Sequence, residues 1–451
     1  MSKKSIPENG IYDARELGAP RMLILGLQHM FAMFGATVLV PVLTGLSVSA
    51  TLLFAGLGTL LFHLLAKGKV PAFLGSSFAF IGGYAAIAPN QEAHLLPYAC
   101  FGVACAGLLY VILAALVKAF GTKKVMKFFP PIVTGPIIIC IGLILSSSAI
   151  DNCRTNWWIA LVASVVVILA NIFGKGMIKI IPILLGVVAS YVIAAVTGNV
   201  DFTPVKDAAW IGLPFQMKNT VIGLLTSADL DPSMLITAAI TIMPLALATM
   251  VEHIGDVCAI SSTCGKKYIE EPGLHRTLLG DGLATTLASL FGAPANTTYG
   301  ENTGVLALSK VYDPRVIRIA AYFAILFSFC PKFAALISAM PAATIGGISM
   351  ILYGMISAVG VRNVVENKVD FTNTRNVIVA AVIMVLAIGI NYSGAVSFNI
   401  GSVTISLSGL AVAALVGIIL NAILPGKDYE FGTDEQGDTS VNFQVGDNKQ
   451  D

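Results

Sequence analysis

Two glutamates, Glu252 and Glu301, lie in stretches of the sequence that are otherwise apolar enough to sit in a membrane. Glu252 falls within residues 242–260 and Glu301 within residues 296–308. Placing a carboxylate at the centre of a bilayer costs about 3 kcal/mol on insertion scales, so such a group normally faces the protein interior or an aqueous cavity and marks a substrate or proton path. Two of them in one chain predict a shared polar site in a transporter.

Two aspartates near these glutamates could help to carry a proton. Asp256 follows Glu252 by one helical turn, so both carboxylates fall on one face of a helix. Two like charges so close favour protonation of one of them, which suits a proton carrier; alternatively, Asp256 caps local backbone. Asp281, between two glycines, is either a second proton-coupling group or a residue at the membrane edge. For Glu252, the alternative is a buried ion pair with His253.

The composition predicts a polytopic helical membrane protein. The chain is 56% hydrophobic and only 12% charged, against about 25% charged for a soluble domain. The seven cysteines include no CxxC pair, and the sequence shows no metal-ligand spacing, so we expect neither a disulfide framework nor a cofactor. The absence of a GxxxxGK[ST] motif argues against an ATP-driven pump. No pairing of a nucleophile with a base suggests an enzyme.

Apolar runs between charged or Pro/Gly breaks predict fourteen membrane segments. If both termini are cytoplasmic, the outside loops carry only four basic residues, Arg154, Lys206, Lys218 and Lys332, and the other 23 fall at inside ends. This is a strong positive-inside bias, which supports the even count. The first twenty residues contain no apolar core and predict no secretory signal peptide. The predicted segments are 22–46, 50–65, 71–88, 98–120, 131–150, 157–173, 178–197, 234–260, 276–292, 294–308, 316–330, 336–356, 376–391 and 409–424.

The segments 71–88 and 294–308 are too interrupted by proline, glycine and polar residues to form continuous spanning helices. Irregular backbone at membrane depth is tolerated only where it is buried in protein or lines a cavity. The two segments also resemble each other, since residues 76–79 (SSFA) align with 297–300 (TTYG) at an offset of 221. Paired interrupted segments indicate a transporter built from repeats with a site at the midplane. Because seven spans is an odd number, the second repeat must run inverted.

Three motifs stand out, at residues 28–41 (QHMFAMFGATVLVP), 75–80 (GSSFAF) and 296–302 (NTTYGEN). They resemble the nucleobase–ascorbate transporter family of nucleobase/cation symporters, and its bacterial uracil permease branch in particular. The family signature stands at residues 301–310 (ENTGVLALSK), with Ser309 in place of the usual threonine. The resemblance extends from about residue 22 to residue 424.

The resemblance implies an all-α membrane protein of 14 transmembrane segments in two inverted seven-span repeats, with a short strand and a short helix in spans 3 and 10. Spans 1–4 and 8–11 would form a core domain, and spans 5–7 and 12–14 a gate domain. The implied bounds are core 22–120 and 234–330, gate 131–197 and 336–424, an outside loop at 198–233 and a cytoplasmic tail at 425–451.

The resemblance also assigns roles to individual residues. The substrate would bind at Glu252, Glu301, Phe78, Gly300, Tyr299 and Tyr353. Proton coupling or support of the site would fall to Asp256, His29, Asp281 and Asn302. The residue types suit a planar base with N–H and C=O groups, because carboxylates accept hydrogen bonds and free N–H groups at broken helix ends donate them. Gly300 lets a flat ring approach the backbone, and an aromatic residue at 78 could cover it.

The implied function is proton-coupled import of uracil across the inner membrane by a homodimer, with no nucleic acid as partner. A purine or xanthine permease is the alternative, because uracil permeases carry His at the position of Asp256 and Asn at that of Asp281. Glu301 argues for uracil, since the purine branch typically has Gln there. An anion exchanger or channel is less favoured, because no basic residue lies within 76–80 or 297–301.

Overall fold

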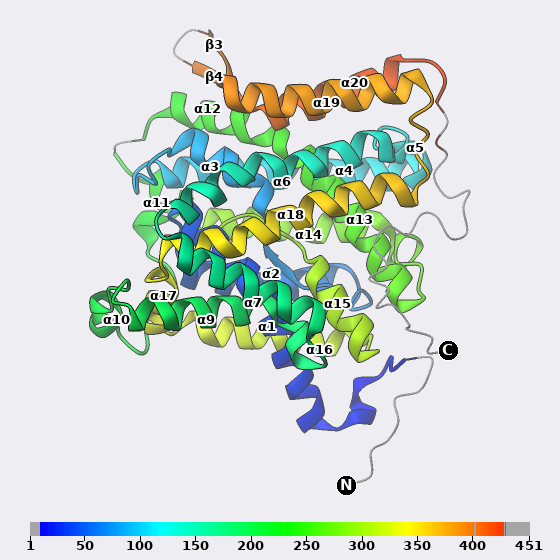
Figure 1. The fold of residues 1–451 in the computed structure, drawn as a ribbon. Coiled ribbons are helices and arrows are strands. Elements are labelled where there is room, and N and C mark those ends of the chain that lie inside the picture. Colours follow the sequence, from blue (N-terminus) through cyan, green and yellow to red (C-terminus); the bar gives the residue numbers. More distant parts are fainter. Residues whose placement is uncertain (1–9, 229, 401–402, 428, 430–451) are drawn as a thin grey trace.

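The computed structural model describes residues 10–228, 230–400, 403–427 and 429, which form a bundle of helices lying along one common direction (Figure 1). Helix α5 and the end of α20 lie at one end of the bundle, and α10, α11 and α17 lie at the other (Figure 1). Within these described residues, seven helices are long and apolar enough to cross a membrane, and a bent pair raises the number to eight. The prediction of a multi-pass helical membrane protein is therefore confirmed.

The first half of the described chain carries six long helices and one interrupted segment. The long helices are α1 (Ala19–Thr44), α2 (Val48–Leu65), α4 (Leu96–Phe120), α6 (Pro131–Arg154), α7 (Trp157–Phe173) and α9 (Pro182–Val196). The interrupted segment comprises strand β1 (Leu74–Ser76), the 3₁₀ helix η2 (Phe78–Phe80) and α3 (Ile81–Ile87). Shorter elements are η1 (Ala14–Leu17), α5 (Thr122–Met126) and α8 (Met177–Ile180).

The second half follows a similar order after a connecting region with α10 (Thr203–Asp207), η3 (Met217–Asn219) and α11 (Val221–Leu225). Its interrupted segment comprises strand β2 (Asn296–Thr298) and α15 (Gly300–Ser309). The other helices are α12 (Pro232–Ile242), η4 (Met243–Leu245), α13 (Ala246–Cys264), the π-helical turn η5 (Ile269–Gly273), α14 (Leu274–Leu290), α16 (Pro314–Ser328), α17 (Pro331–Ser338), α18 (Ala342–Glu366), α19 (Thr374–Ser393) and α20 (Gly409–Ile423).

Several helix starts are fixed by side-chain caps that the sequence supplies. A cap oxygen satisfies backbone N–H groups that have no partner within the first turn, which is worth about 1 kcal/mol. The capping residues of α2, α7, α12, α16, α19 and α20 are Ser47, Asn156, Asp231, Asp313, Asn373 and Ser408. The starts of α3 and α15 have no side-chain cap. Both lie in the interrupted segments.

Strands β1 and β2 pair in antiparallel fashion in the middle of the bundle. Gly75 lies opposite Thr297. Two further bonds extend the pairing symmetrically, from the Ser77 N–H to the Ala295 carbonyl (2.8 Å) and from the Tyr299 N–H to the Phe73 carbonyl (3.0 Å). Residues 71–88 and 294–308 are thus interrupted as predicted, and their buried backbone groups satisfy one another.

The helices of the two halves make matching contacts. Helix α2 packs against α16 as α4 packs against α14, and α7 packs against α18 as α19 packs against α6. The pair α7 and α9 is matched by α19 and α20. The most extensive contact, between α6 and α18, joins one helix from each half.

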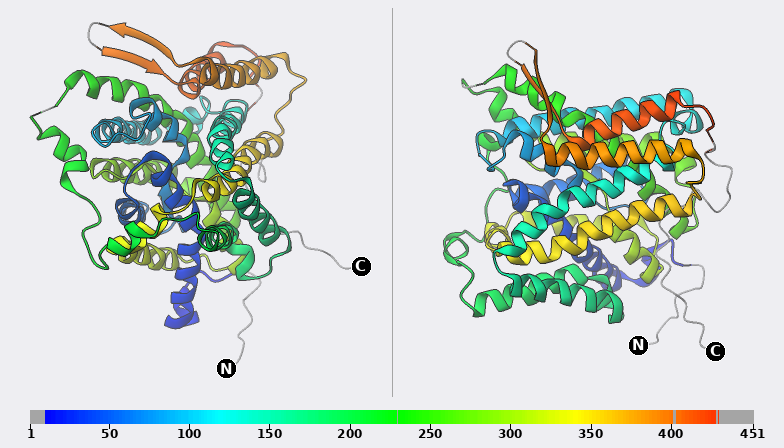
Figure 2. Two further views of the ribbon diagram at one scale, coloured as in Figure 1. Left: turned by 60° about the vertical axis from the view of Figure 1, so that its left-hand side comes forward. Right: turned by 45° about the horizontal axis from the view of Figure 1, so that its top comes forward.

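A hairpin of β3 (Val396–Ile400) and β4 (Val403–Leu407) projects beyond α19 (Figure 2). The sequence analysis assigned no element to residues 392–408. A signal was present, because residues 396–400 (VSFNI) and 403–407 (VTISL) alternate apolar and polar side chains, the period expected of a strand. Neither strand contains a long apolar run, which is the pattern that predicts a membrane helix.

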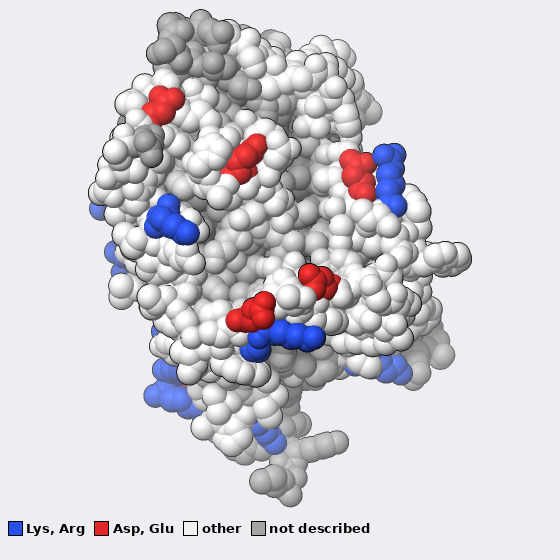
Figure 3. Space-filling view, turned by 90° about the vertical axis from the view of Figure 1, so that its left-hand side faces the viewer, with Lys and Arg blue, Asp and Glu red and all other residues white. Residues whose placement is uncertain are grey.

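The end of the bundle that carries α10, α11 and α17 shows scattered side chains of both charges (Figure 3). Lys206 and Lys332, two of the four basic residues predicted to lie outside, meet at this end. Lys332 Nζ donates to the carbonyls of Val205 (2.9 Å) and Lys206 (3.2 Å). The positive-inside pattern of the sequence predicts that this end faces outside.

Close contact between α6 and α18 depends on Gly142. A Cβ atom at this position would lie 2.2 Å from the Tyr353 carbonyl oxygen. We expect Gly142→Ala to destabilise the protein by about 1–3 kcal/mol, because backbone cannot move aside as a side chain can. Thermal unfolding of the purified protein in detergent measures this. The matched control is Gly354→Ala on α18, where a Cβ would meet nothing within 4 Å; equal melting temperatures for the two variants would contradict the packing.

Candidate functional site

The 3₁₀ helix η2, which leads into α3, begins at Phe78, and α15 begins at Gly300. Each start lies two residues after its strand, so the two uncapped helix ends are held close to the strand pair. An uncapped first turn offers N–H donors and the positive end of the helix dipole. Phe78 and Gly300, two of the predicted contacts, stand at these positions. The backbone of Glu301 lies in the first turn of α15, and its side chain lies outside the described part of the structure.

Tyr299 locks the two interrupted segments together. Its hydroxyl donates to the Ser76 carbonyl (2.8 Å), and Ser76 Oγ donates to the Thr37 carbonyl on α1 (2.8 Å). The ring lies over Gly75, where an added Cβ would be 2.5 Å from it. Tyr299 is buried. The described contacts of this predicted substrate residue therefore hold the strand pair in register.

The polar face of α13 lies against the start of α15. Asp256 Oδ2 accepts a hydrogen bond from Thr298 Oγ1 (3.2 Å), and its Oδ1 lies 3.5 Å from where a Cβ on Gly300 would stand. Glu252 precedes Asp256 by one turn, so it shares this face. Both carboxylates are partly exposed within the bundle. Asp256 therefore contacts the second interrupted segment. The alternative stated from the sequence was that the Asp256 carboxylate caps local backbone.

His253 points to the other side of Thr298 and meets Asp281. The distance from His253 Nδ1 to Asp281 Oδ2 is 3.1 Å, and that from His253 Nδ1 to Thr298 Oγ1 is 3.4 Å. Both side chains are fully buried inside the protein. His253 Nδ1 and Asp281 Oδ2 lie within ion-pair distance of each other. Asp256, Thr298, His253 and Asp281 thus form a continuous polar chain.

The sequence analysis missed two members of this chain. Thr298 was seen only as part of a motif, and His253 only as an ion-pair partner for Glu252. The structure places His253 against Asp281 on α14, with the rings of Phe62 and Tyr110 edge-on to it at 6.3 and 6.4 Å. The position of Thr298, two residues before Gly300, could have indicated that it belongs to the site. Nothing in the sequence indicated the approach of α14.

His29 is held by Asn302. Asn302 Nδ2 donates to the His29 carbonyl (3.1 Å) and lies 3.2 Å from His29 Nδ1. The contact joins α1 to the first turn of α15. An amide nitrogen can only donate, so Nδ1 accepts and the ring proton stands on Nε2. His29 Nε2 has no hydrogen-bond partner among the described residues.

Tyr353 reaches the site from α18 through Phe78. The two rings meet edge to face, with centroids 5.8 Å apart at 76°. A cavity of about 30 Å³ adjoins Phe78, which is space for one or two water molecules. The predicted residues therefore gather around the strand pair from four directions: α1, α13, α15 and α18. Asp281 lies further from the strand pair, with His253 between them.

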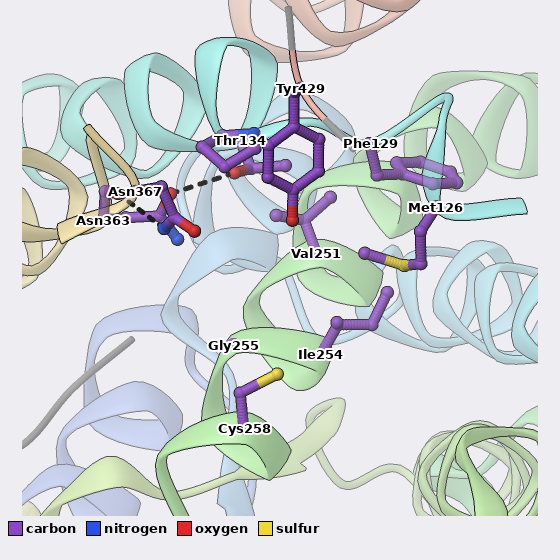
Figure 4. A pocket seen from close by; sticks show the side chains of 11 residues that line it. Met126, Phe129, Thr134, Val251, Ile254, Gly255, Cys258, Asn363, Asn367 and Tyr429 are labelled. Atoms are coloured by element: carbon purple, nitrogen blue, oxygen red, sulfur yellow. Dashed lines mark hydrogen bonds between the residues drawn. The ribbon is translucent and has the colours of Figure 1, made fainter. Parts of the chain in front are cut away.

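A second cavity, of about 40 Å³, lies on the neighbouring face of α13 (Figure 4). Val251, Gly255 and Cys258 form one wall. Thr134 of α6 and Asn363 of α18 form the opposite wall, and their side chains are 3.3 Å apart. Tyr429 lies over the opening. Helix α13 thus separates the polar site from a small cavity that borders α6 and α18.

Comparison with known proteins decides the family. A family model described as a permease family matches residues 20–396. The chain belongs to this permease family. It is similar to the uracil permease of Bacillus subtilis (strain 168), with 40% identity over 451 residues that cover 97% of this chain and 99% of the relative. It is 42% identical to the uracil permease of Bacillus caldolyticus over 414 residues, which cover 90% and 92% of the two chains.

The fold of this permease is also found in a solved structure of low sequence identity. The transmembrane domain of a cyanobacterial bicarbonate transporter, BicA, matches with a TM-score of 0.58 and 16% identity, covering 92% of this chain and 99% of that one. At this identity the likeness concerns the fold alone, since one fold hosts many functions. The family membership identifies a transporter and not an enzyme.

The bond between Tyr299 and Ser76 gives a stability prediction. We expect Tyr299→Phe to lose about 1–3 kcal/mol, because it leaves a buried carbonyl without this donor. Tyr322→Phe, at an exposed position on α16, is the matched control and should leave the melting temperature unchanged. A Tyr299→Phe protein as stable as the control would show that the bond does not hold the strand pair.

Proposed function

We propose that this permease imports uracil together with protons, at a site between the β1–β2 pair and α13. The observation that carries the proposal is the approach of Asp256 to Gly300, which brings the carboxylates of α13 to the uncapped start of α15. Two relatives of about 40% identity over nearly the whole chain carry the name uracil permease.

The chemistry of the base suits this arrangement. Uracil presents two N–H donors and two C=O acceptors in one plane. Glu252 and Glu301 accept from the N–H groups, and the free N–H groups at the starts of η2 and α15 donate to the carbonyls. Gly300 admits the flat ring, and Phe78 covers its face. Tyr299, bonded to Ser76, keeps both helix starts in place.

The structure supports an inverted repeat of fourteen spans in two ways. Under the offset of 221 residues, the pair Gly75 and Thr297 maps onto the pair Ser76 and Asn296, so the strand register maps onto itself, as a two-fold axis requires. The helix contacts also repeat in equivalent pairs, such as α2 with α16 and α14 with α4. Inverted repeats of this kind place the substrate near the bilayer midplane.

We divide the permease into a core (residues 22–120 and 234–330) and a gate (131–197 and 336–424). Helices α6, α7, α9, α18, α19 and α20 pack mainly with one another, which supports this division. The contact of Phe78 with Tyr353 crosses it. Movement of the core against the gate would expose the site to each side in turn. Both termini would face the cytoplasm across the inner membrane, with the loop 198–233 outside. Most of the tail 425–451 lies outside the described residues.

Coupling to protons would use the polar chain that begins at Asp256. A proton on Asp256 or Glu252 neutralises a carboxylate that would otherwise stand beside its like charge. Thr298 and His253 connect that position to the buried Asp281 within 3.4 Å at every step. His29, held by Asn302, supports the opposite side of α15.

The acids at 256 and 281 also resemble the purine branch of the family, which makes xanthine the second candidate substrate. An anion substrate is disfavoured, because residues 76–80 and 297–301 contain no basic side chain to meet it. The shared fold with a bicarbonate transporter does not change this, since the site residues decide the substrate.

Glu301→Gln tests the substrate assignment. The amide keeps one acceptor but loses the charge, so uracil binding should weaken by about 1.5–3 kcal/mol, which is roughly ten- to hundred-fold. Binding of labelled uracil to the purified protein measures the loss. Glu270→Gln, at an exposed position, is the matched control. Unchanged uracil affinity in Glu301→Gln would remove this residue from the site, and a gain in xanthine affinity would show that it sets the base preference.

Asp256→Asn tests the coupling assignment. The variant should lose accumulation driven by a proton gradient, while equilibrium binding of uracil survives, because Glu252 and Glu301 still meet the ring. Asp256→His, the residue of uracil permeases, should retain coupling with a shifted pH optimum. Asp201→Asn, in the loop 198–233, serves as control. Full accumulation by Asp256→Asn would leave Glu252 or Glu301 as the proton carrier.

We also propose that two copies associate, largely through their gate domains. The proposal rests on family resemblance. Mass measurements in mild detergent and in bilayers should find a dimer. A monomer with full transport activity in both would contradict it.

A further inference from the structure

An apolar groove of about 600 Å³ runs between α4 and α20 on the outside of the bundle. It is lined by Leu109, Ile112, Leu113, Leu116, Phe120, Lys124, Val125, Phe128, Phe129, Leu247, Met250, Leu415, Ile418 and Ile419. Lys124 is the single polar member of this set. Figure 2 shows α20 beside α4 and α5 at the same end of the bundle. Ile112 and Phe120 are 56% and 59% exposed, so the groove opens to the surroundings of the protein.

The groove has the length of one membrane leaflet. From Leu109 to Phe120 the rise of α4 is about 17 Å, which is roughly half of the ~30 Å hydrocarbon core. The apolar wall therefore matches an acyl chain that enters from one side of the membrane. Lys124 of α5 forms the polar end of the groove.

Lysines gather at that end without acidic neighbours in the chain. Lys118, Lys123, Lys124 and Lys127 lie within ten residues, and residues 93–150 contain no Asp or Glu. None of the four makes an ion pair with a described residue. Asn421 of α20 donates to the Lys127 carbonyl (3.1 Å), so the end of α20 adjoins the same cluster. Basic residues beside a membrane helix attract anionic headgroups.

We infer that this groove binds a glycerophospholipid with an anionic headgroup, its acyl chain along α4 and α20 and its phosphate at Lys124. Charge complementarity selects this occupant, because a neutral lipid would leave the lysine cluster without a counter-charge. Since α4 belongs to the proposed core and α20 to the proposed gate, a bound lipid touches both. It therefore favours one relative position of the two parts, and by linkage it changes transport.

Lipid retention on the purified protein tests the site without any substrate. The protein is incubated with phosphatidylglycerol or phosphatidylcholine, and the bound lipid is counted by native mass spectrometry. We expect wild-type protein to retain phosphatidylglycerol preferentially. In Lys124→Gln the ratio of bound phosphatidylglycerol to bound phosphatidylcholine should fall roughly fivefold. Leu116→Trp, which fills the groove, should lose retention of both lipids.

Matched controls keep the result interpretable. Lys175→Gln removes an exposed lysine distant from the groove in sequence, and Leu108→Trp places the same ring at an exposed position of α4 that does not line it. Both should bind as wild type does. Equal retention of the two lipids, or loss in the controls as well, would overturn the proposal. Loss of dimers in Leu116→Trp with unchanged lipid retention would make the groove an interface between copies.

Transport in vesicles forms the second arm and rests on the proposed function. Uracil uptake by wild-type protein should rise several-fold when phosphatidylglycerol replaces phosphatidylcholine, and Lys124→Gln should not respond. A wild-type protein that binds phosphatidylglycerol but takes up no uracil in either lipid would overturn the proposed substrate and leave the lipid site standing.

Discussion

The arrangement of the site in this permease depends on six residues of β-structure in the middle of the helical bundle. Unpaired backbone N–H and C=O groups cannot be buried in an apolar interior. Strands β1 and β2 therefore pair with each other, and the hydroxyls of Thr59 and Thr285 bond further backbone groups of Leu74 and Asn296. The pairing ends two would-be membrane helices in mid-bundle. It thereby places the starts of η2 and α15, with their free N–H groups, close to the same strand pair. Tyr299, Ser76 and Gly75 fix the register, and the polar face of α13 closes against it.

Polar side chains then collect where the backbone is irregular. Thr298 is one residue of β2, yet its hydroxyl contacts both Asp256 and His253. Asn302 uses its amide to hold His29 of α1. Each contact joins an interrupted segment to a long helix. A change in the position of α13 or α1 therefore reaches the strand pair directly, which is the property that alternating exposure of a central site requires.

Much of this arrangement could be predicted from the sequence, because certain residue types interrupt a helix or require a polar interior. Pro71, Gly75 and Gly300 indicated breaks in the apolar runs. Glu252 and Glu301 indicated a polar interior. Other features depend on which helices become neighbours. The approach of α14, which gives Asp281 its place behind His253, and the projection of β3 and β4 follow from tertiary packing. The bond of Tyr299 to Ser76 spans 223 residues, and no local pattern indicates it.

The central claim is that the carboxylates beside the strand pair bind uracil and couple its entry to protons. Proteoliposomes that contain the purified permease, with and without an inward proton gradient, test this when labelled uracil and labelled xanthine are supplied in parallel. The account predicts accumulation of uracil above its outside concentration only with the gradient, and little accumulation of xanthine. Accumulation of xanthine in place of uracil, or uracil accumulation that does not respond to the gradient, would contradict it.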